Sequence, residues 1–485
     1  MLVHIMSFIP VCLPLYIAGE PLVTSQPLEV RYPYDGSLTG TVSTARHEHL
    51  EAAIQAALKG HAPLSRYSRE QVLRRASLIF SQRTEEFARL MTRETGLALK
   101  DTRAEASRVC DVLHGASMAA MECDDATFWG DVTPPGKILG SRNRSVHVMR
   151  EPLRLAAAIT PFNHPLTQLA HKVAPAIAAG TPIILKPSDK TPLTAVRFAE
   201  TLYEAGLPGW MLSVLIGPVD TVIEPLITDP RVEAISFTGS VAVGKRIAGM
   251  AGYKRVCLEL GGNSELIVLK DADLALAAKL ACEGSYRNSG QRCTAVKRVL
   301  AEESIYEELA QRITEATKAF MSGDPEDSKT DVGTLISESA AIGIEKSLHE
   351  AMARGAVLLT GGQRNVALLA PTVLKDVPRD APLVVEETFG PVTPIIPVRD
   401  LADAIQYANS SRYGLSTSVV TDSMSQAMTA IRELHTGMVH VNEVPGYRLE
   451  QAPFGGIKDS GLGIKEGIIE AKKFYSNSKT YSLPW

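Results

Sequence analysis

Cysteine is scarce in this sequence, and the few that are present are not grouped. None belongs to a CxxC pair or lies beside a histidine-rich stretch, which argues against a disulfide framework and against a zinc site. The six are Cys12, Cys110, Cys123, Cys257, Cys282 and Cys293. We therefore expect no metal centre, and we expect a protein of the reducing cytoplasm.

Long apolar runs are also missing. The best candidate, residues 8–18, is interrupted by Pro10 and Pro14 and has no Lys or Arg before it. It is too short to span a bilayer and lacks the charged start of a signal peptide. We expect this segment to be a first strand or an extended start of the fold, and we expect no association with a membrane.

No charge of one sign dominates the chain. The sequence has 50 Lys and Arg against 54 Asp and Glu, a net charge of −4. Nothing in that balance indicates a nucleic acid or an anionic surface as a partner. There is no low-complexity tract and no repeat at solenoid periods.

What the middle of the chain does contain is a regular alternation of strand and helix patterns after two helical stretches, residues 48–58 and 70–95. The predicted strands are residues 153–159, 181–185, 212–216, 232–237 and 255–260, and the predicted helices between them are residues 165–179, 192–205, 219–228 and 241–250. Such alternation indicates a doubly wound, mostly parallel sheet, which binds ligands at the carboxyl ends of its strands.

A second α/β unit follows with a weaker pattern. Its helices are expected at residues 272–286, 305–321 and 401–410, with strand and loop at 383–394 and a strand at 438–444. Residues 127–148 have little periodicity, and the tail after Glu470 is polar and strand-prone. Neither segment has a core pattern, so we expect both to contact another subunit.

The sharpest local signal is the hexapeptide SGQRCT, residues 289–294. Gly290 permits a close backbone approach, and the Cys293 thiolate could form and release a thioester. The neighbouring Arg287 and Arg292 are expected to lower the pKa of that thiol. From the hexapeptide alone, a buried structural cysteine is an equally good interpretation.

Two other strand ends carry candidate catalytic groups. Glu259 ends an apolar strand before two glycines, where desolvation would raise its pKa and suit it to general-base work. Taken alone, a solvated strand-end glutamate is the simpler interpretation. In the segment TPFNHP, residues 160–165, Pro165 suits the first turn of a helix and Asn163 offers an amide donor for an oxyanion. A plain helix cap explains Asn163 equally well.

Two segments are candidates for cofactor contacts. KPSD, residues 186–189, follows a strand, and FTGSVAVGK, residues 237–245, follows a strand and begins a helix. The second nearly matches a P-loop, but Arg246 occupies the position of the magnesium-binding Ser or Thr. We therefore reject a nucleoside triphosphate site and keep a helix N-terminus that faces a diphosphate.

In this order, the motifs resemble those of one family, the aldehyde dehydrogenases. The resemblance runs from about residue 16 to the C-terminus and rests on residues 161–163, 186–188, 237–240, 259–262, 290–293, 386–391 and 453–461. It implies an α/β fold with a doubly wound parallel-sheet NAD domain (residues 1–127 and 151–258), a second α/β catalytic domain (residues 259–460) and a small β oligomerisation arm (residues 128–150 and 470–485). A homodimer or a homotetramer would fit that arm.

The resemblance also implies roles for individual residues. Cys293 would be the nucleophile, Asn163 the oxyanion donor and Glu259 the base that activates water. Asp189 matches the position that binds the ribose 2′-hydroxyl, so NAD is expected in preference to NADP. The cofactor contacts implied by the family pattern are Thr160, Phe162, Lys186, Ser188, Asp189, Gly239, Ser240, Gly244, Glu387 and Phe389.

Basic residues occupy positions that line the aldehyde pocket in the family. They are Arg108, His164, His171, Arg292 and Arg448. His164 and His171 are seven residues apart and are predicted on one helix face. Paired donors of this kind recognise tetrahedral anions and carboxylates, although solvated surface charges are the alternative.

The expected substrate is therefore a short anionic aldehyde. Residues 288–298, 443–450 and 453–463 resemble the phosphonoacetaldehyde dehydrogenases. Sulfoacetaldehyde, glyceraldehyde 3-phosphate, succinate semialdehyde and lactaldehyde remain alternatives, because a count of cations does not separate their headgroups. A CoA-acylating aldehyde dehydrogenase and a non-catalytic binding protein are further alternatives.

Overall fold

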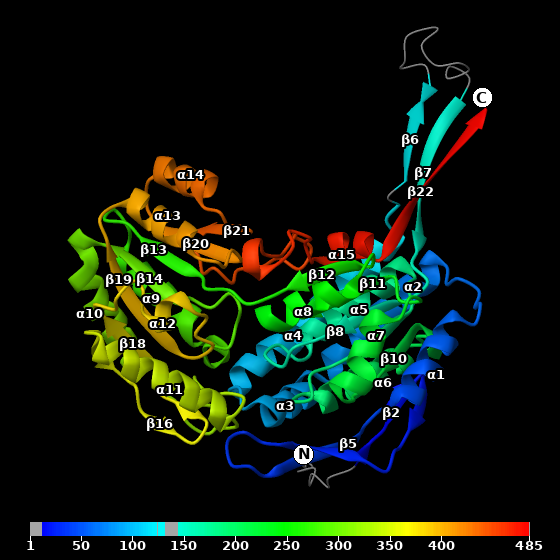
Figure 1. Ribbon diagram of the computed structural model, residues 1–485, viewed down its shortest axis with the longest axis horizontal. Coiled ribbons are helices and arrows are strands. Elements are labelled where there is room, and N and C mark those ends of the chain that lie inside the picture. Colours follow the sequence, from blue (N-terminus) through cyan, green and yellow to red (C-terminus); the bar gives the residue numbers. More distant parts are fainter. Residues whose placement is uncertain (1–11, 124, 131–143, 485) are drawn as a thin grey trace.

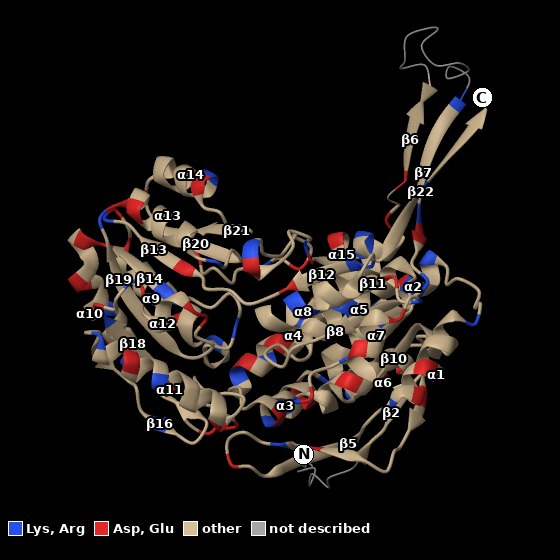
Figure 2. Ribbon diagram, viewed as in Figure 1, with Lys and Arg blue, Asp and Glu red and all other residues tan. Residues whose placement is uncertain are grey.

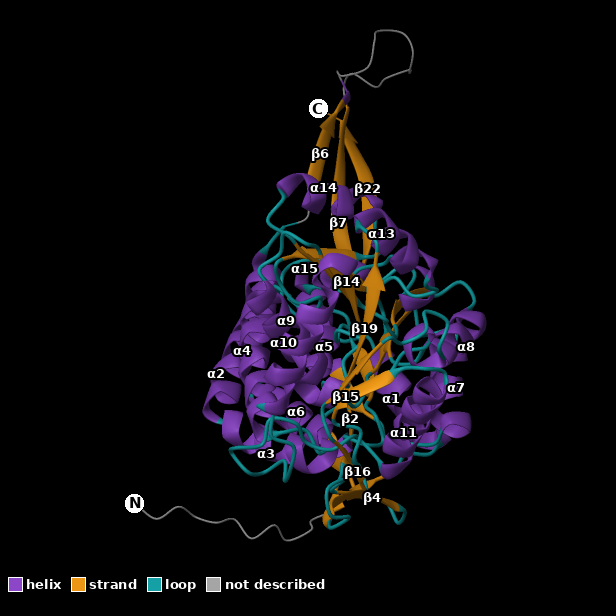
Figure 3. Ribbon diagram, turned by 90° about the vertical axis from the view of Figure 1, so that its left-hand side faces the viewer, coloured by secondary structure: helices purple, strands orange, loops and turns teal. Residues whose placement is uncertain are grey.

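The computed structural model describes residues 12–123, 125–130 and 144–484. Two lobes lie side by side, and a narrow group of strands projects from one of them (Figure 1). Seen from the side, helices flank the central strands and the projecting strands point away from the body (Figure 3). In the part of the chain described, no helix is long and apolar enough to cross a membrane.

The first lobe is built on a seven-stranded sheet in the order β12-β11-β8-β9-β10-β2-β3. Every residue of β8 and β9 is buried, as expected for parallel strands covered on both faces. The strands are β2 Leu15–Ile17, β3 Glu20–Leu22, β8 Ala156–Ile159, β9 Ile183–Lys186, β10 Leu212–Val214, β11 Ala234–Thr238 and β12 Arg255–Glu259. The predicted doubly wound sheet is therefore confirmed.

The order of these strands reverses at β8. From β8 the chain moves outward through β9 to β10, then returns to the other side of β8 for β11 and β12. The carboxyl ends of strands at such a reversal form a crevice that binds ligands. The helices of this lobe are α1 His47–Leu58, α2 Arg66–Gln82, α3 Thr84–Thr95, α4 Leu99–Met121, α5 Thr167–Ala179, α6 Pro192–Glu204, α7 Glu224–Thr228 and α8 Val241–Ala251.

Two of these helices are capped by buried glutamates from other helices. Glu105 of α4 accepts hydrogen bonds from the backbone N–H groups of Leu166 and Thr167, both 2.9 Å, at the start of α5. Glu94 of α3 accepts from the N–H groups at the start of α6, 2.7 Å for Leu193. These carboxylates satisfy N–H groups that a helix cannot satisfy internally.

The second lobe has another seven-stranded sheet, in the order β15-β18-β19-β14-β13-β20-β21, parallel except for β15 against β18. Its strands are β13 Glu265–Val268, β14 Arg298–Glu302, β15 Val357–Thr360, β18 Thr372–Lys375, β19 Val392–Val398, β20 Ser416–Val420 and β21 Met438–Val441. Its helices are α9 Leu274–Tyr286, α10 Tyr306–Lys318, α11 Glu338–Ala353, α12 Pro382–Val385, α13 Leu401–Ser410 and α14 Met424–Glu433.

Three smaller sheets complete the fold: β1-β5-β4, β16-β17 and β22-β7-β6. The last is the projecting group of strands in Figures 1 and 3, which we call the arm. Their bounds are β1 Cys12–Leu13, β4 Pro27–Arg31, β5 Leu38–Ser43, β6 Ala126–Trp129, β7 Arg144–Pro152, β16 Arg364–Asn365, β17 Leu368–Leu369 and β22 Ser476–Pro484. Part of the arm predicted from the sequence, residues 131–143, lies outside the described residues.

Three local predictions are corrected by the structure. The helix expected from residue 165 begins at Thr167, because Glu105 caps it there. The tail expected to be extended after Glu470 starts with helix α15, Ile468–Phe474, whose Ile468 and Ala471 pack into the first lobe. The strand and loop expected at 383–394 begin with the short helix α12.

Candidate active site

The predicted functional residues of the first lobe follow the carboxyl ends of its central strands. Thr160, Phe162 and Asn163 follow β8, Lys186 ends β9, Gly239 and Ser240 follow β11, and Glu259 ends β12. Because these strands are parallel neighbours, their ends meet at one edge of the sheet, where the second lobe also begins. The structure therefore brings these residues together at the crevice.

Cys293 follows a strained turn at the end of α9. Asn288, Ser289 and Gly290 have φ values of 53°, 53° and 70°, a left-handed run that costs free energy for the two residues with a Cβ. Asp101 accepts from the Asn288 N–H at 2.8 Å, and the Ser289 hydroxyl donates to Gly333 O at 3.0 Å. These bonds hold the turn in a conformation that the free chain would avoid.

Gly290 is required at this turn for a second reason. A Cβ there would collide with the backbone carbonyl of Gly390, which belongs to the segment containing Glu387 and Phe389. The expected close approach of backbone at Gly290 is therefore present. It brings the segment before Cys293 directly against the segment that carries two of the predicted cofactor contacts.

The environment of Cys293 raises the pKa of its thiol to about 12. Burial is the largest cause, and the carboxylates Glu387 and Glu259 act in the same direction. Arg292 and Lys297 oppose them but do not prevail. The expectation of a lowered pKa is wrong, because desolvation of the thiolate outweighs the neighbouring cations.

Asn163 lies against the segment that precedes Cys293. Its side-chain amide donates to Gln291 O at 2.8 Å, and its own carbonyl accepts from the Asn288 amide at 3.1 Å. Asn163 is buried and does not begin α5, which starts four residues later. The alternative of a plain helix cap is therefore excluded.

Glu259 is buried and its carboxylate has no hydrogen-bond partner. Both side-chain oxygens are unpaired, and burial raises the pKa of this group well above its ordinary value. Glu466 adds to the shift, while Lys172, bonded to Glu466 at 2.5 Å, opposes it. A Cβ at Gly455 would lie 2.5 Å from the Glu259 Oε1 atom. The alternative of a solvated strand-end glutamate is excluded.

The predicted adenosine-side contacts are ordered by their neighbours. The Lys186 ammonium donates to Asp189 at 2.7 Å, and the Ser188 hydroxyl accepts from the Lys190 N–H at 3.2 Å. Ser240 caps α8 through the Val243 N–H at 3.5 Å and is exposed. An uncharged cap at an exposed helix N-terminus leaves room for a diphosphate.

Two glycines of this region are fixed by packing. A Cβ at Gly244 would collide with the Leu260 side chain, and a Cβ at Gly239 would lie 2.5 Å from the Phe237 ring. Gly244 therefore lets α8 pack closely on the sheet, and Gly239 lets the turn after β11 pass over Phe237.

Glu387 and Phe389 approach from the second lobe. Glu387 accepts from the Gly262 N–H at 3.0 Å, and burial raises its pKa while Lys297 opposes the shift. Phe389 meets Phe162 edge to face with ring centres 6.1 Å apart. The predicted cofactor residues of the second lobe thus contact Gly262 and Phe162 directly.

The basic residues predicted for the substrate divide into two groups. Arg108 donates to the Glu450 carboxylate at 2.6 and 2.8 Å, and Arg448 donates to His171 Nδ1 at 2.9 Å. Arg448 also stacks on Phe454 at 4.2 Å. Arg292 lies against the same loop at Gly446, where a Cβ would be 3.4 Å from both terminal nitrogens of Arg292.

The two histidines do not behave as predicted. His164 lies in the turn before α5, 3.3 Å from Glu105, and not on a helix face with His171. Burial and the nearby Arg448 lower the pKa of His171 to about 4, so His171 is neutral near pH 7. His171 therefore adds no positive charge to the predicted basic group.

Unpaired buried polar atoms gather around this cluster. In the described part of the chain, the buried side-chain atoms without a hydrogen bond include His171 Nε2, Arg292 Nε, Arg448 Nε and Glu450 Oε2. His171 Nε2 and Glu450 Oε2 face each other at 2.8 Å, which leaves Arg292 Nε and Arg448 Nε as the donors that a polar ligand would satisfy. The alternative of solvated surface charges does not describe Arg292 or Arg448, whose side chains are buried.

Sequence reasoning missed several residues of the site. Glu450 contacts Arg108, His171 and Arg448, and Lys297 donates to Gly290 O at 2.7 Å and Thr388 O at 2.6 Å. A signal existed for Glu450, which is two residues from Arg448 in the loop. Lys297 is buried among apolar residues of the strand β14 region, where a lysine is unusual.

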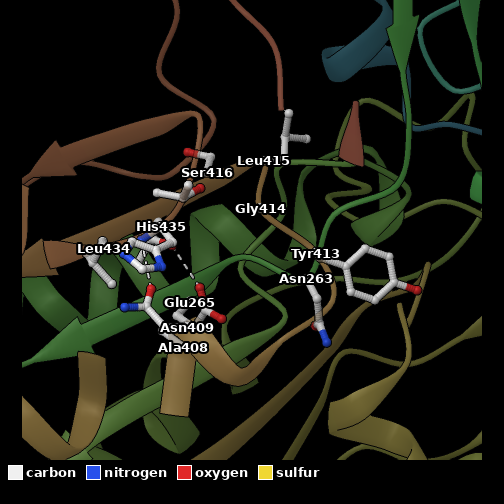
Figure 4. A pocket seen from close by; sticks show the side chains of 12 residues that line it. Asn263, Glu265, Ala408, Asn409, Tyr413, Gly414, Leu415, Ser416, Leu434 and His435 are labelled. Carbon is white, nitrogen blue, oxygen red and sulfur yellow. Dashed lines mark hydrogen bonds between the residues drawn. The ribbon is translucent and has the colours of Figure 1, made fainter. Parts of the chain in front are cut away.

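A separate small cavity lies in the second lobe (Figure 4). Its volume is about 10 Å³, and the lining includes Asn263, Glu265, Asn409 and His435. Glu265 accepts from Thr417 at 2.8 Å and Asn409 accepts from the His435 N–H at 2.7 Å. Asn263 Oδ1 and the Thr436 hydroxyl have no partner there, and a single water molecule in a cavity of this volume would satisfy them, so we assign no chemistry to it. Among the described residues, no group of three potential ligands gathers to hold a metal ion.

Lys and Arg are interspersed with Asp and Glu over both lobes (Figure 2), so the small net charge gives no indication of the local arginine cluster.

Comparison with known proteins adds to this geometry. A family model for the aldehyde dehydrogenase family matches residues 22–481. The 3-sulfolactaldehyde dehydrogenase of Priestia megaterium is 36% identical over 456 residues, covering 93% of this chain and 94% of that protein.

Two further relatives cover nearly the whole chain. The lactaldehyde dehydrogenase of Methanococcus maripaludis is 34% identical over 476 residues, covering 96% of this chain and 99% of that protein. A crystal structure of NADP-dependent glyceraldehyde-3-phosphate dehydrogenase from Bacillus halodurans, complexed with NADP, superposes with a TM-score of 0.93 at 32% identity, covering 98% and 99% of the two chains. The chain belongs to the aldehyde dehydrogenase family, whose members are NAD(P)-dependent oxidoreductases.

Proposed function

We propose that this enzyme oxidises a short aldehyde with an anionic headgroup to its carboxylic acid, with NAD as the cofactor, and that the substrate is phosphonoacetaldehyde. The observation that carries the proposal is that Arg292, next to Cys293, lies against the loop in which Arg448 and Glu450 meet Arg108, and that Arg292 and Arg448 each have an unpaired nitrogen. Guanidinium groups recognise tetrahedral anions through paired donors. The names of the relatives in Priestia and Bacillus include two other anionic aldehydes.

In the proposed mechanism, the Cys293 thiol passes its proton to water as its sulfur attacks the aldehyde carbon, and a thiohemiacetal oxyanion forms. The Asn163 amide, held at the turn before Cys293, donates to the oxygen that becomes negative. NAD, when bound, supplies the acceptor for the hydride that leaves the same carbon. Glu259 then takes a proton from water, the water oxygen attacks the resulting thioester, and Cys293 departs as thiolate.

The residues present fit a dinucleotide. Lys186, Ser188 and Ser240 would hold the adenosine and diphosphate end, and Glu387 and Phe389 the nicotinamide end. Asp189 would accept from the ribose 2′-hydroxyl and disfavour a 2′-phosphate. Support comes from its position beside Lys186 at the end of β9.

The CoA-acylating alternative is disfavoured by Glu259, a buried unpaired carboxylate at the site. Formation of the free acid without CoA is the expected result.

The arm is proposed to join subunits of a homodimer or homotetramer, because its strands expose Phe128, Trp129 and Leu483. Deletion of residues 476–485 would then lower the mass in solution measured by light scattering. The proposed compartment is the cytoplasm, where the free cysteines stay reduced.

A substrate panel tests the headgroup. We expect kcat/KM to be higher for phosphonoacetaldehyde than for sulfoacetaldehyde, glyceraldehyde 3-phosphate, succinate semialdehyde, lactaldehyde and propanal. Arg292→Ala and Arg448→Ala should each lower kcat/KM for anionic substrates by roughly tenfold to a hundredfold, the worth of one charge-assisted contact. Activity on propanal should change little. Equal oxidation of charged and uncharged aldehydes would refute the proposal.

An exposed arginine provides the matched control. Arg312 of α10 is half exposed and pairs with Glu308 on its own helix. Arg312→Ala should leave every substrate ratio unchanged. If Arg312→Ala lowers kcat/KM for anionic substrates as much as Arg292→Ala does, the loss would reflect the net charge of the protein and not a specific anion site.

A further inference from the structure

A carboxylate sits inside the proposed anion pocket. The Glu450 Oε1 atom accepts both hydrogen bonds from Arg108 of α4. Its other oxygen, Oε2, lies 2.8 Å from His171 Nε2 of α5 and 3.8 Å from Arg448 Nε of the same loop. The charged or titratable groups that face Glu450 thus come from α4, from α5 and from its own loop.

The Oε2 atom of Glu450 can accept a further hydrogen bond, because a carboxylate oxygen has two lone pairs. It is buried and has no aligned hydrogen bond, although His171 is close. His171 receives the Arg448 N–H on Nδ1, so a neutral His171 carries its proton on Nε2. This cluster therefore places one negatively charged acceptor beside Arg108, Arg448 and the imidazole of His171.

An acceptor distinguishes anions that carry a proton from anions that do not. A sulfonate or a carboxylate near neutral pH presents only acceptor oxygens. A phosphoryl group loses its second proton at about pH 6, so part of a phosphonate population still carries a hydroxyl. That hydroxyl can donate to a carboxylate, whereas a sulfonate oxygen in the same place would face it with no proton between them.

We propose that Glu450 is a specificity residue that accepts a hydrogen bond from the hydroxyl of a monoprotonated phosphonate, while the arginines bind its other oxygens. This inference rests on the anionic-aldehyde function proposed above. In this role Glu450 contacts the substrate directly, whereas a residue that only orients the arginines would not. It also predicts discrimination against a sulfonate of nearly the same shape.

The protein groups around Glu450 keep their charge between pH 6 and pH 8. The nearby His171, Arg108 and Arg448 outweigh the effect of burial and hold the pKa of Glu450 down at about 2, and burial lowers the pKa of His171 to about 4. A change of selectivity across this range therefore reports the substrate's proton. From pH 6 to pH 8 the monoprotonated fraction of a phosphoryl group falls from about one half to about one hundredth.

The test measures the ratio of kcat/KM for phosphonoacetaldehyde to kcat/KM for sulfoacetaldehyde at pH 6 and pH 8. A ratio within one enzyme cancels the titration of groups that act on both substrates. The unaltered enzyme should lose about tenfold or more of this ratio between the two pH values. A ratio that stays constant or rises would overturn the proposal, whatever the variants do.

Glu450→Gln keeps the shape and removes the charged acceptor. Its ratio at pH 6 should fall by about tenfold or more and become nearly independent of pH. Glu443→Gln is the matched control in the same loop, since its carboxylate accepts from the neighbouring Val444 N–H and should leave the ratio unchanged. An equal loss on both anions in Glu450→Gln would mean that Glu450 only orients the arginines, and the inference would be wrong.

Propanal separates this inference from the function on which it rests. If the unaltered enzyme oxidises propanal as well as either anion, the anionic-aldehyde proposal fails. If anions are preferred but the phosphonate-to-sulfonate ratio of kcat/KM changes neither with pH nor in Glu450→Gln, only the role of Glu450 is wrong.

Discussion

Replacement of Glu259 by Gln should separate the two halves of the reaction. The structure buries this carboxylate with no hydrogen-bond partner and raises its pKa well above the ordinary value, chiefly by desolvation. A positioned general base contributes about 10² to 10⁴ in rate. Thioester hydrolysis should therefore slow by about that factor, while hydride transfer, which does not need the base, continues.

Stopped-flow absorbance of NADH measures both steps. Glu259→Gln should give a burst of about one NADH per active site, followed by a steady rate reduced by about 10² to 10⁴. Cys293→Ala is the control and should give neither burst nor turnover. If Glu259→Gln keeps a steady rate within about tenfold of the unaltered enzyme, or loses the burst, the assigned role of Glu259 is wrong.

Three further predictions concern charge and stability. Asp189→Ala should raise kcat/KM for NADP by about fivefold, since an interaction between exposed charges is worth about 1 kcal/mol; preference for NADP in the unaltered enzyme would contradict the assignment. Glu105→Ala should lower the urea-measured unfolding free energy by about 2 kcal/mol or more, by leaving two buried N–H groups at α5 unpaired, whereas Glu86→Ala, at an exposed position of α3, should not. Because the folded-state pKa of Glu259 is raised, its ionisation destabilises the fold as pH rises. Glu259→Gln should therefore have a higher Tm than the unaltered enzyme at pH 8 and a similar Tm near pH 4, as measured by differential scanning calorimetry. A lower Tm of the variant at pH 8 would mean that the surroundings stabilise the carboxylate.

The strand ends could be predicted from the sequence because each is a local pattern. Glu259 follows an apolar strand and precedes two glycines, and the structure places it at the end of β12. The alternation from residue 151 to 260 predicts the parallel sheet for the same reason. Local periodicity reports burial on two faces without any knowledge of distant partners.

Features that depend on distant partners could not be predicted. Arg108 and Glu450 are 342 residues apart in sequence, so nothing local shows that one neutralises the other. His164 was predicted on a helix face, but the cap of α5 comes from α4 and moves the helix start past it. The pKa of Cys293 was predicted with the wrong sign because adjacent arginines are visible in the sequence and desolvation is not.

The glutamate caps of α5 and α6 have a consequence for where phosphates can settle. The structure turns strand into helix after β8, β9 and β11, and each of those helix starts would ordinarily attract an anion. Glu105 and Glu94 already occupy the donors of the first two. At α8 the cap is only the hydroxyl of Ser240. Buried carboxylates of the protein itself therefore block two of the three possible anion sites, and the N-terminus of α8 stays available to a phosphate from solution.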